Sequence, residues 1–471
     1  MADLILSGGP VLTMDPARRL IPEGAVAIAA GRIVAVGPAE EVLARHDAPE
    51  RIDTAGMLAM PGLIDTHSHA GHGMIRNAGR ADGDAWERLC GEVYTRASPP
   101  EFWQAEAALA ALERLRFGTT CGVSLLGGGD TILRTDHPDH AAAHCEGAAA
   151  VGVRDMVAVG STRPPHPLTY ADESGSYPVD YARQKETALA VLRDWHDRGR
   201  QKVALITPVL RDEHERDLSA SDYAAACAQT REMHALAREA GTVFTQDGHW
   251  KGSVRRAEGL GILTPGTLLS HCIDLGEDEQ HMLAETGAAV AHNPSAVASI
   301  LGRCPAVEMM AMGVTVGLGS DATAPDRSAD MFRHVQQAMH YHRTHFRDPS
   351  VLPPGQAVAM ATIEAAGALG LADEIGSLEP GKRADVVLLD LNRAHMVPLH
   401  MPLHRAACFA NGNDVHTVIV DGEVVLRDRK ATRVDEARIL AEAHRQAEIM
   451  FDRVGRRDLL SEDGPATWGG A

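Results

Sequence analysis

Long hydrophobic runs are missing from this 471-residue sequence, and no stretch reaches the length that spans a membrane. The first residues also lack the basic start and the apolar stretch of a secretory signal. Positive charge is scarce: 45 lysines and arginines stand against 64 aspartates and glutamates, a net charge of -19. We therefore expect a cytoplasmic protein with a solvated acidic surface, whose partners are neither nucleic acid nor membranes.

Cysteine is equally sparse, with seven residues, an odd number, and no Cys-x-x-Cys pair. This usage argues against a disulfide framework and favours a reducing compartment. Internal repeats and low-complexity segments are absent as well, which excludes repeat architectures. What is present is an ordinary globular balance of 45% hydrophobic and 23% charged residues, in a chain long enough for one large domain and a smaller one.

Both ends of the chain contain short apolar strands separated by glycine-rich turns. Residues 4–6, 25–28 and 33–36 form the first group, and residues 384–390 and 415–420 form the second. The two groups predict one small β-sandwich domain, made by residues 1–60 and 381–434 pairing with each other. Residues 435–471 are predicted to form a helix followed by a glycine-rich tail.

The middle of the chain, residues 61–380, alternates apolar strands with amphipathic helices. Its predicted strands are the segment before His67 and residues 120–124, 156–159, 203–207, 242–245, 268–270, 289–291 and 314–318. Eight strands with helices between most of them predict an α/β fold, a parallel (β/α)8 barrel of the TIM type. The chemistry of such barrels lies at the C-terminal ends of the strands.

Two histidines two residues apart, His67 and His69, follow the first predicted barrel strand. Alternate residues of a strand point the same way, so both imidazoles project together from the strand end. That arrangement presents two nitrogen ligands to one divalent metal. Further polar residues follow later strands: His271, His292, Asp321 and the cluster Gln246-Asp247-Gly248-His249.

These segments resemble the amidohydrolase superfamily, in its branch of cytosine deaminase-like and triazine hydrolase-like enzymes. The matching motifs are Pro61-Gly62-Leu63-Ile64-Asp65-Thr66-His67-Ser68-His69, Ser270-His271-Cys272, Ala291-His292-Asn293-Pro294-Ser295, Gly319-Ser320-Asp321 and Gly376-Ser377-Leu378-Glu379-Pro380-Gly381. The resemblance covers nearly the whole chain. It implies a metal-bearing barrel with a composite β-sandwich, and a homo-oligomer.

The resemblance also implies a mechanism. His67, His69 and Asp321 correspond to metal ligands, and Asp321 also accepts a proton from the bound water. The metal, one divalent zinc or iron ion, lowers the pKa of that water so that hydroxide exists near neutral pH. His271 corresponds to the histidine that orients the hydroxide. The hydroxide then attacks an sp2 carbon of a small nitrogen heterocycle, and in a deaminase the leaving group is ammonia.

The chain departs from the family after the fifth barrel strand, where relatives carry His-x-x-Glu. If the spacing is preserved, Gln246 replaces the ligand and His249 replaces the proton-shuttling glutamate. A second alignment places Asp247 toward the metal and leaves Trp250 at the shuttle position. We prefer the first alignment. Either departure alters proton transfer, so hydrolysis of a cyclic amide or of another carbon–heteroatom bond, such as dechlorination or desulfhydration, is an alternative reaction.

Two further residues are predicted to contact the substrate. Arg76 lies just past the first barrel strand and suits an anionic or carbonyl group, and His292 follows the seventh strand. The loops after the strands, which set the substrate, contain no recognisable motif. A third interpretation, from a different functional class, is a metal-binding relative that has kept the fold and lost turnover.

Overall fold

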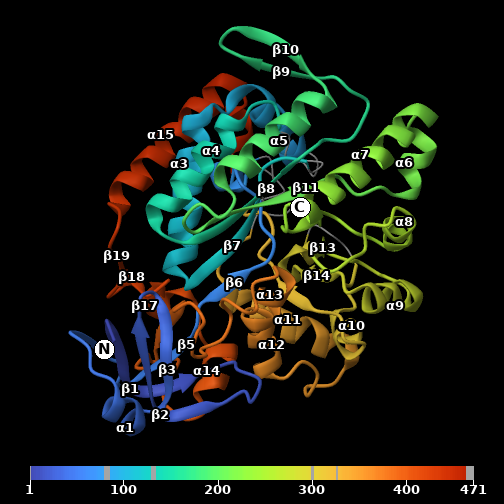
Figure 1. Cartoon of the computed structure of the whole chain (residues 1–471). Coiled ribbons are helices and arrows are strands. Elements are labelled where there is room, and N and C mark those ends of the chain that lie inside the picture. The colour runs from blue at the N-terminus through green and yellow to red at the C-terminus, as the bar shows by residue number, and fades with distance from the viewer. Residues whose placement is uncertain (1, 79–84, 129–133, 299–301, 325–326, 463–471) are drawn as a thin grey trace, which may run out of the picture.

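The computed structural model describes residues 2–78, 85–128, 134–298, 302–324 and 327–462 (Figure 1). Two sheets dominate this part of the chain. One has eight parallel strands from the middle of the sequence, and the other has nine strands drawn from both ends. The predicted α/β fold, a barrel with a composite terminal domain, is confirmed.

The eight strands of the barrel pair in chain order. They are β6 (Leu63–Asp65), β7 (Thr119–Leu125), β8 (Arg154–Gly160), β11 (Gln201–Ile206), β12 (Phe244–Gln246), β13 (Thr267–Ser270), β14 (Ala289–His292) and β15 (Val316–Leu318). The first and last strands meet, because the Thr66 N–H donates to Leu318 O at 2.9 Å and the Asp321 N–H to His67 O at 2.8 Å. Strands β7, β8 and β14 are buried along their whole length, as expected for a parallel sheet covered on both faces.

Helices surround the barrel (Figure 1). Those of the barrel region are α2 (Ala85–Glu92), α3 (Pro100–Arg116), α4 (Pro138–Val151), α5 (Tyr181–Trp195), α6 (Asp212–Asp217), α7 (Ala220–Glu239), α8 (Ser253–Gly259), α9 (Glu277–Thr286), α10 (Ala306–Ala311), α11 (Met331–Phe346), α12 (Pro354–Met360) and α13 (Ile363–Ala368). Side chains of Asp180 and Ser219 accept backbone N–H groups in the first turns of α5 and α7. These bonds satisfy donors that a helix start otherwise leaves without a partner.

The small domain joins both ends of the chain. Its strands are β1 (Leu4–Leu12), β2 (Leu20–Ala29), β3 (Arg32–Pro38), β4 (Glu50–Asp53), β5 (Met57–Pro61), β16 (Val386–Asp390), β17 (Val415–Val420), β18 (Glu423–Arg427) and β19 (Lys430–Ala431). The two groups meet where β16 pairs antiparallel with β5. Apolar side chains cover both faces: Val26 and Leu388 belong to one cluster, and Ile5 packs with Val42 of α1 (Ala39–Arg45) in another.

The remaining elements decorate these two units. They are the hairpin β9 (Leu168–Asp172) and β10 (Gly175–Val179), helices α14 (Pro402–Cys408) and α15 (Glu436–Val454), and the short turns η1 (His72–Met74), η2 (Val93–Ala97), η3 (Pro294–Ala298), η4 (Gly412–Asp414) and η5 (Arg457–Leu460). The helix α15, red in Figure 1, lies along α3 and begins directly after residue 435. The predicted glycine-rich tail from residue 463 lies outside the described residues. Every helix that the structure describes is too short or too polar to cross a bilayer.

Candidate metal centre

The chain beyond β6 carries two histidines into one site. Although β6 ends at Asp65, ladder pairing continues, since Ser68 bridges Asp321 and His69 bridges Leu125. The backbone therefore stays extended, and alternate side chains keep pointing to opposite sides. The His67 and His69 rings lie together, with centroids 5.1 Å apart, while the Ser68 hydroxyl donates to Val123 O at 2.9 Å.

Asp321 enters the same site from the loop after β15. Its Oδ1 lies 3.2 Å from His69 Nε2 and 3.8 Å from His67 Nε2. The close approach of the two loops requires glycine at position 319, because a Cβ there would lie 2.8 Å from the Cβ of His67. Asp321 has a φ of 64°, a left-handed conformation that non-glycine residues rarely adopt and that recurs at functional sites.

His271 follows β13 and has the same left-handed backbone, with a φ of 68°. Its Nε2 lies 3.2 Å from Asp247 Oδ1 and 3.9 Å from Asp321 Oδ2. The Asn293 amide nitrogen is 3.3 Å from the same ring nitrogen. The His271 ring therefore points toward the group formed by His67, His69 and Asp321.

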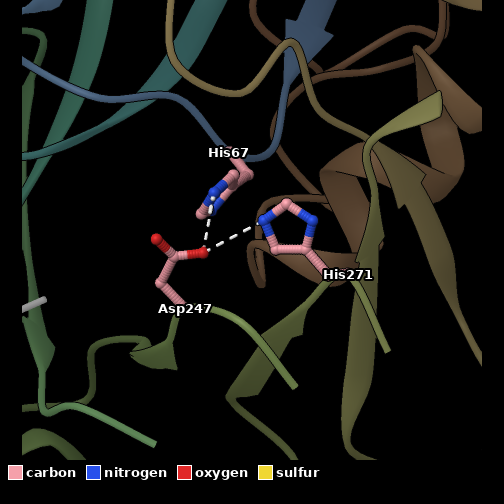
Figure 2. A group of neighbouring side chains, drawn as sticks. All are labelled: His67, Asp247 and His271. Carbon is pink, nitrogen blue, oxygen red and sulfur yellow. Dashed lines mark ion pairs between the residues drawn. The ribbon is translucent and has the colours of Figure 1, made fainter. Parts of the chain in front are cut away.

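Asp247 lies at the centre of this group, as Figure 2 shows for its contacts with His67 and His271. Its Oδ1 is 3.2 Å from Nε2 of each of these two histidines, and its Oδ2 is 3.3 Å from His69 Nε2. The Ser270 hydroxyl donates to Oδ1 at 2.7 Å and fixes the carboxylate. One side chain thus contacts three imidazoles that come from two strand ends.

The preferred alignment after the fifth strand requires correction, because Asp247, and not Gln246, faces the histidines. The Gln246 amide donates instead to the Thr207 hydroxyl and to Pro208 O, both at 3.1 Å. His249 is also directed away from this group: its Nε2 lies 3.2 Å from Gln246 Oε1, and its Nδ1 lies 2.9 Å from Ser253 Oγ. The physical reason is that β12 ends at Gln246 and the chain then turns at Gly248, whose φ is 90°.

The charges of the site favour ionised carboxylates. Burial alone raises the pKa of Asp247, but His67 and His69 outweigh it and hold that pKa well below its usual range. Burial likewise raises the pKa of Asp321, and Arg327 and His69 outweigh it. For His69, burial lowers the pKa, yet Asp247 and Asp321 raise it to about 9. For His249, burial followed by Arg211 outweighs the opposing effect of Asp247 and lowers the pKa to about 3.

A buried carboxylate beneath the site joins the first and last strand ends. Asp65 accepts the Ser320 N–H at 2.9 Å and the Ser320 hydroxyl at 2.6 Å, and the His67 N–H at 3.3 Å. Arg114 lies 3.6 Å from the same carboxylate and balances its charge. Sequence reasoning missed this positioning role, although Asp65 stands inside the motif that contains His67.

The donor atoms fit a divalent metal ion. Two overlapping groups, His67 with Asp247 and His271, and His67 with His69 and Asp321, each place their ligand atoms within 4.8 Å of one another. All four ring nitrogens of His67 and His69 are buried and lack a hydrogen bond of normal geometry to any described residue. Buried polar atoms of this kind are costly without a partner, and a metal ion supplies one.

The two residues predicted to contact substrate lie in different surroundings. The Arg76 side chain is 40% exposed and forms an ion pair with Glu113 of α3. His292 is buried, with its Nε2 3.2 Å from Nε2 of His342, and lines a small cavity together with His271 and Asn293. The structure thus brings His292 next to the site and pairs Arg76 with Glu113 of α3.

Comparison with known proteins identifies the family. The Amidohydrolase family model matches residues 58–425, and an imidazolonepropionase-like composite domain of bacteria matches residues 24–48. The chain belongs to the amidohydrolase family. The expectation of an amidohydrolase-type enzyme, a hydrolase of C–N bonds, is confirmed.

Relatives and solved structures cover almost the whole chain. The 5-methylthioadenosine/S-adenosylhomocysteine deaminase of Nitratidesulfovibrio vulgaris (strain DP4) is 32% identical over 96% of this chain and 98% of that protein. The 5'-deoxyadenosine deaminase of Methanosarcina mazei is 28% identical, over 96% and 100%. A zinc-bound adenosine deaminase from Xanthomonas campestris has the same fold, with a TM-score of 0.82, 24% identity, and coverage of 96% and 99%.

Proposed function

We propose that this member of the amidohydrolase family is a metal-dependent deaminase. It hydrolyses the bond between a ring carbon of a small nitrogen heterocycle and an amino group, and it releases ammonia. The observation that carries the proposal is the convergence of three imidazoles and two carboxylates at the C-terminal ends of the barrel strands, namely His67, His69, His271, Asp247 and Asp321. Relatives that match nearly the whole chain are named as deaminases.

Each residue has a role in this proposal. His67, His69, Asp247 and Asp321 hold one divalent ion, zinc or iron, since imidazole and carboxylate ligands accept both. That ion, when bound, lowers the pKa of a water molecule and supplies a nucleophile near neutral pH. The Asp321 carboxylate holds the proton that the water gives up, and His271 Nε2 orients the reacting oxygen.

The proposed substrate class follows from the relatives. Two relatives are named for 5'-modified adenosines, so we propose a purine nucleoside as the first substrate to test. His292 and Asn293 line a cavity of about 10 Å³ beside His271, which has room for about one water molecule and therefore does not define the substrate. We also propose a cytoplasmic location, which the sparse cysteines favour, and a homo-oligomer, which the resemblance implies.

The experiment combines metal analysis with a product assay. Purified protein is analysed for zinc and iron by mass spectrometry and then assayed for ammonia with adenosine, 5'-deoxyadenosine, 5-methylthioadenosine, S-adenosylhomocysteine and guanine. We expect one ion per chain, ammonia release from at least one compound, and loss of turnover in His67→Ala. Protein without metal, or with metal and no ammonia from any compound, contradicts the proposal.

One observation favours a second reaction in the same site. The position expected to carry the proton-shuttling glutamate is Trp250, whose ring lies 5.9 Å from the Arg211 guanidinium carbon and is 36% exposed. Chloride leaves without being protonated, so a reaction that releases chloride has less need of an acidic side chain in the site. A chlorotriazine and its aminotriazine analogue, compared for chloride and ammonia release, distinguish the two reactions.

A further inference from the structure

A buried guanidinium lies against the back of Asp321. Arg327 Nη2 is 3.6 Å from Asp321 Oδ2, and the two side chains are 4% and 5% exposed. Arg327 Nη1 also donates to Ala322 O at 3.3 Å and to Ala324 O at 3.2 Å. The arginine is therefore bound to the same loop that carries the carboxylate, and its charge stays inside the protein.

The two oxygens of Asp321 have different neighbours. Oδ1 lies 3.2 Å from His69 Nε2 and accepts the Ala322 N–H at 2.6 Å. Oδ2 lies on the side of Arg327. Cation and amide together restrain both oxygens, which fixes the plane of the carboxylate and directs Oδ1 toward the histidines.

Asp321 also has a second carboxylate close by. Asp247 Oδ2 is 3.3 Å from His69 Nε2, so Asp247 and Asp321 contact the same imidazole nitrogen. Asp321 is buried and the Asp247 side chain is 18% exposed, so these neighbouring carboxylates repel each other at the reduced dielectric of the site. A buried cation behind one of them opposes that repulsion.

We propose that Arg327 is a positioning residue that holds Asp321 ready for the metal. This inference rests on the metal site assigned under the proposed function. The guanidinium restrains Asp321 against the repulsion from Asp247, so the incoming ion meets a ligand that is already in place. Sequence reasoning missed Arg327, because it is an arginine in a loop with no motif around it.

The test measures zinc affinity, which needs no substrate. Metal-free protein is titrated with zinc in competition with a chelating dye. Arg327→Met is expected to bind zinc about 10- to 100-fold more weakly, the usual cost of losing a group that orients a ligand. Arg327→Lys keeps the charge and should recover most of the affinity. Arg333→Met, an exposed arginine on α11, is the matched control and should leave it unchanged.

The same substitution made in Asp321→Asn protein distinguishes a positioning role of Arg327 from a general structural role. In Asp321→Asn the carboxylate charge is gone, so adding Arg327→Met should change the remaining zinc affinity by less than about threefold. An equal loss in both backgrounds, or unchanged affinity in Arg327→Met, overturns the inference. Arg327→Gln replaces the methionine variant if the latter does not fold. Wild-type protein that binds no zinc or iron overturns the proposed function itself, which is a different result.

Discussion

The loops after β6 and β12 both place side chains in the same group, but they do so in different ways. After β6 the backbone stays paired, through bridges at Ser68 and His69, and strand alternation places two histidines side by side. After β12 the ladder is interrupted beyond Gln246 and resumes only at the bridge between Trp250 and Ile273. Within this gap a single side chain, that of Asp247, enters the site before the chain turns. Strand periodicity therefore predicts side-chain direction past a strand end only where pairing continues.

Among the substitutions that test this comparison, replacement of Asp247 is expected to have the largest effect. Asp247→Ala removes a carboxylate that contacts three imidazoles, and we expect zinc affinity to fall by about 100-fold or more and turnover to be lost. Gln246→Ala, its neighbour, should change zinc affinity by less than about threefold, because its amide bonds to Thr207 and Pro208. Zinc titration of the two metal-free variants gives both numbers.

The melting temperature is the control for Asp247→Ala and Gln246→Ala, because it reports on folding. Gln246→Ala leaves the Thr207 hydroxyl and Pro208 carbonyl without their partner, which costs stability of about 1–3 kcal/mol. Its melting temperature should therefore drop although its zinc affinity does not. The reverse pattern, a large zinc effect in Gln246→Ala and a small one in Asp247→Ala, restores the alignment that we discarded.

The contrast between the loops after β6 and β12 also explains which features could be predicted from the sequence. The barrel, the terminal domain and the positions of His67, His69, His271 and Asp321 followed from strand periodicity and from the family motifs. The choice between Gln246 and Asp247 did not, because it depends on where β12 stops pairing, a one-residue difference that reverses side-chain direction. The contacts of Arg327 and Asp65 depend on the folded structure, so residue spacing in the sequence predicts neither of them.

His249 provides a further test of the comparison, because the discarded alignment assigned it the role of proton shuttle. Its two ring nitrogens lie against Gln246 and Ser253. His249→Asn should lower the free energy of unfolding by about 1–3 kcal/mol and change zinc affinity by less than about threefold. We expect kcat to fall by less than about tenfold, as measured on the substrate found in the ammonia assay. A kcat loss of about 100-fold or more with an unchanged melting temperature would instead identify a shuttle.

The pH dependence of stability distinguishes the histidines of the two loops in metal-free protein. The pKa of His249 falls from 6.5 to about 3, so its contribution to stability is present above pH 6.5 and is lost as the pH falls toward 3. The pKa of His69 rises from 6.5 to about 9, so its contribution is present below pH 6.5 and is lost as the pH rises through 9.

Thermal melts of metal-free variants from pH 4 to 9 measure this difference. The melting-temperature loss in His249→Asn should be largest above pH 6.5 and shrink in acid. The loss in His69→Asn should be largest below pH 6.5 and shrink in base. Parallel curves for the two variants contradict the assignment of opposite charge states to the two loops.

The smallest effect is expected at Arg76, which also follows β6 but lies beyond the paired segment. Its guanidinium contacts Glu113, and 40% of its side chain is exposed. Exposed ion pairs contribute about 0–1 kcal/mol, so Arg76→Ala should lower the free energy of unfolding by no more than about 1 kcal/mol and leave KM within about twofold. A KM increase of about tenfold or more, with kcat unchanged, would show that Arg76 reaches the substrate, and that side chains beyond the ladder after β6 serve the site after all.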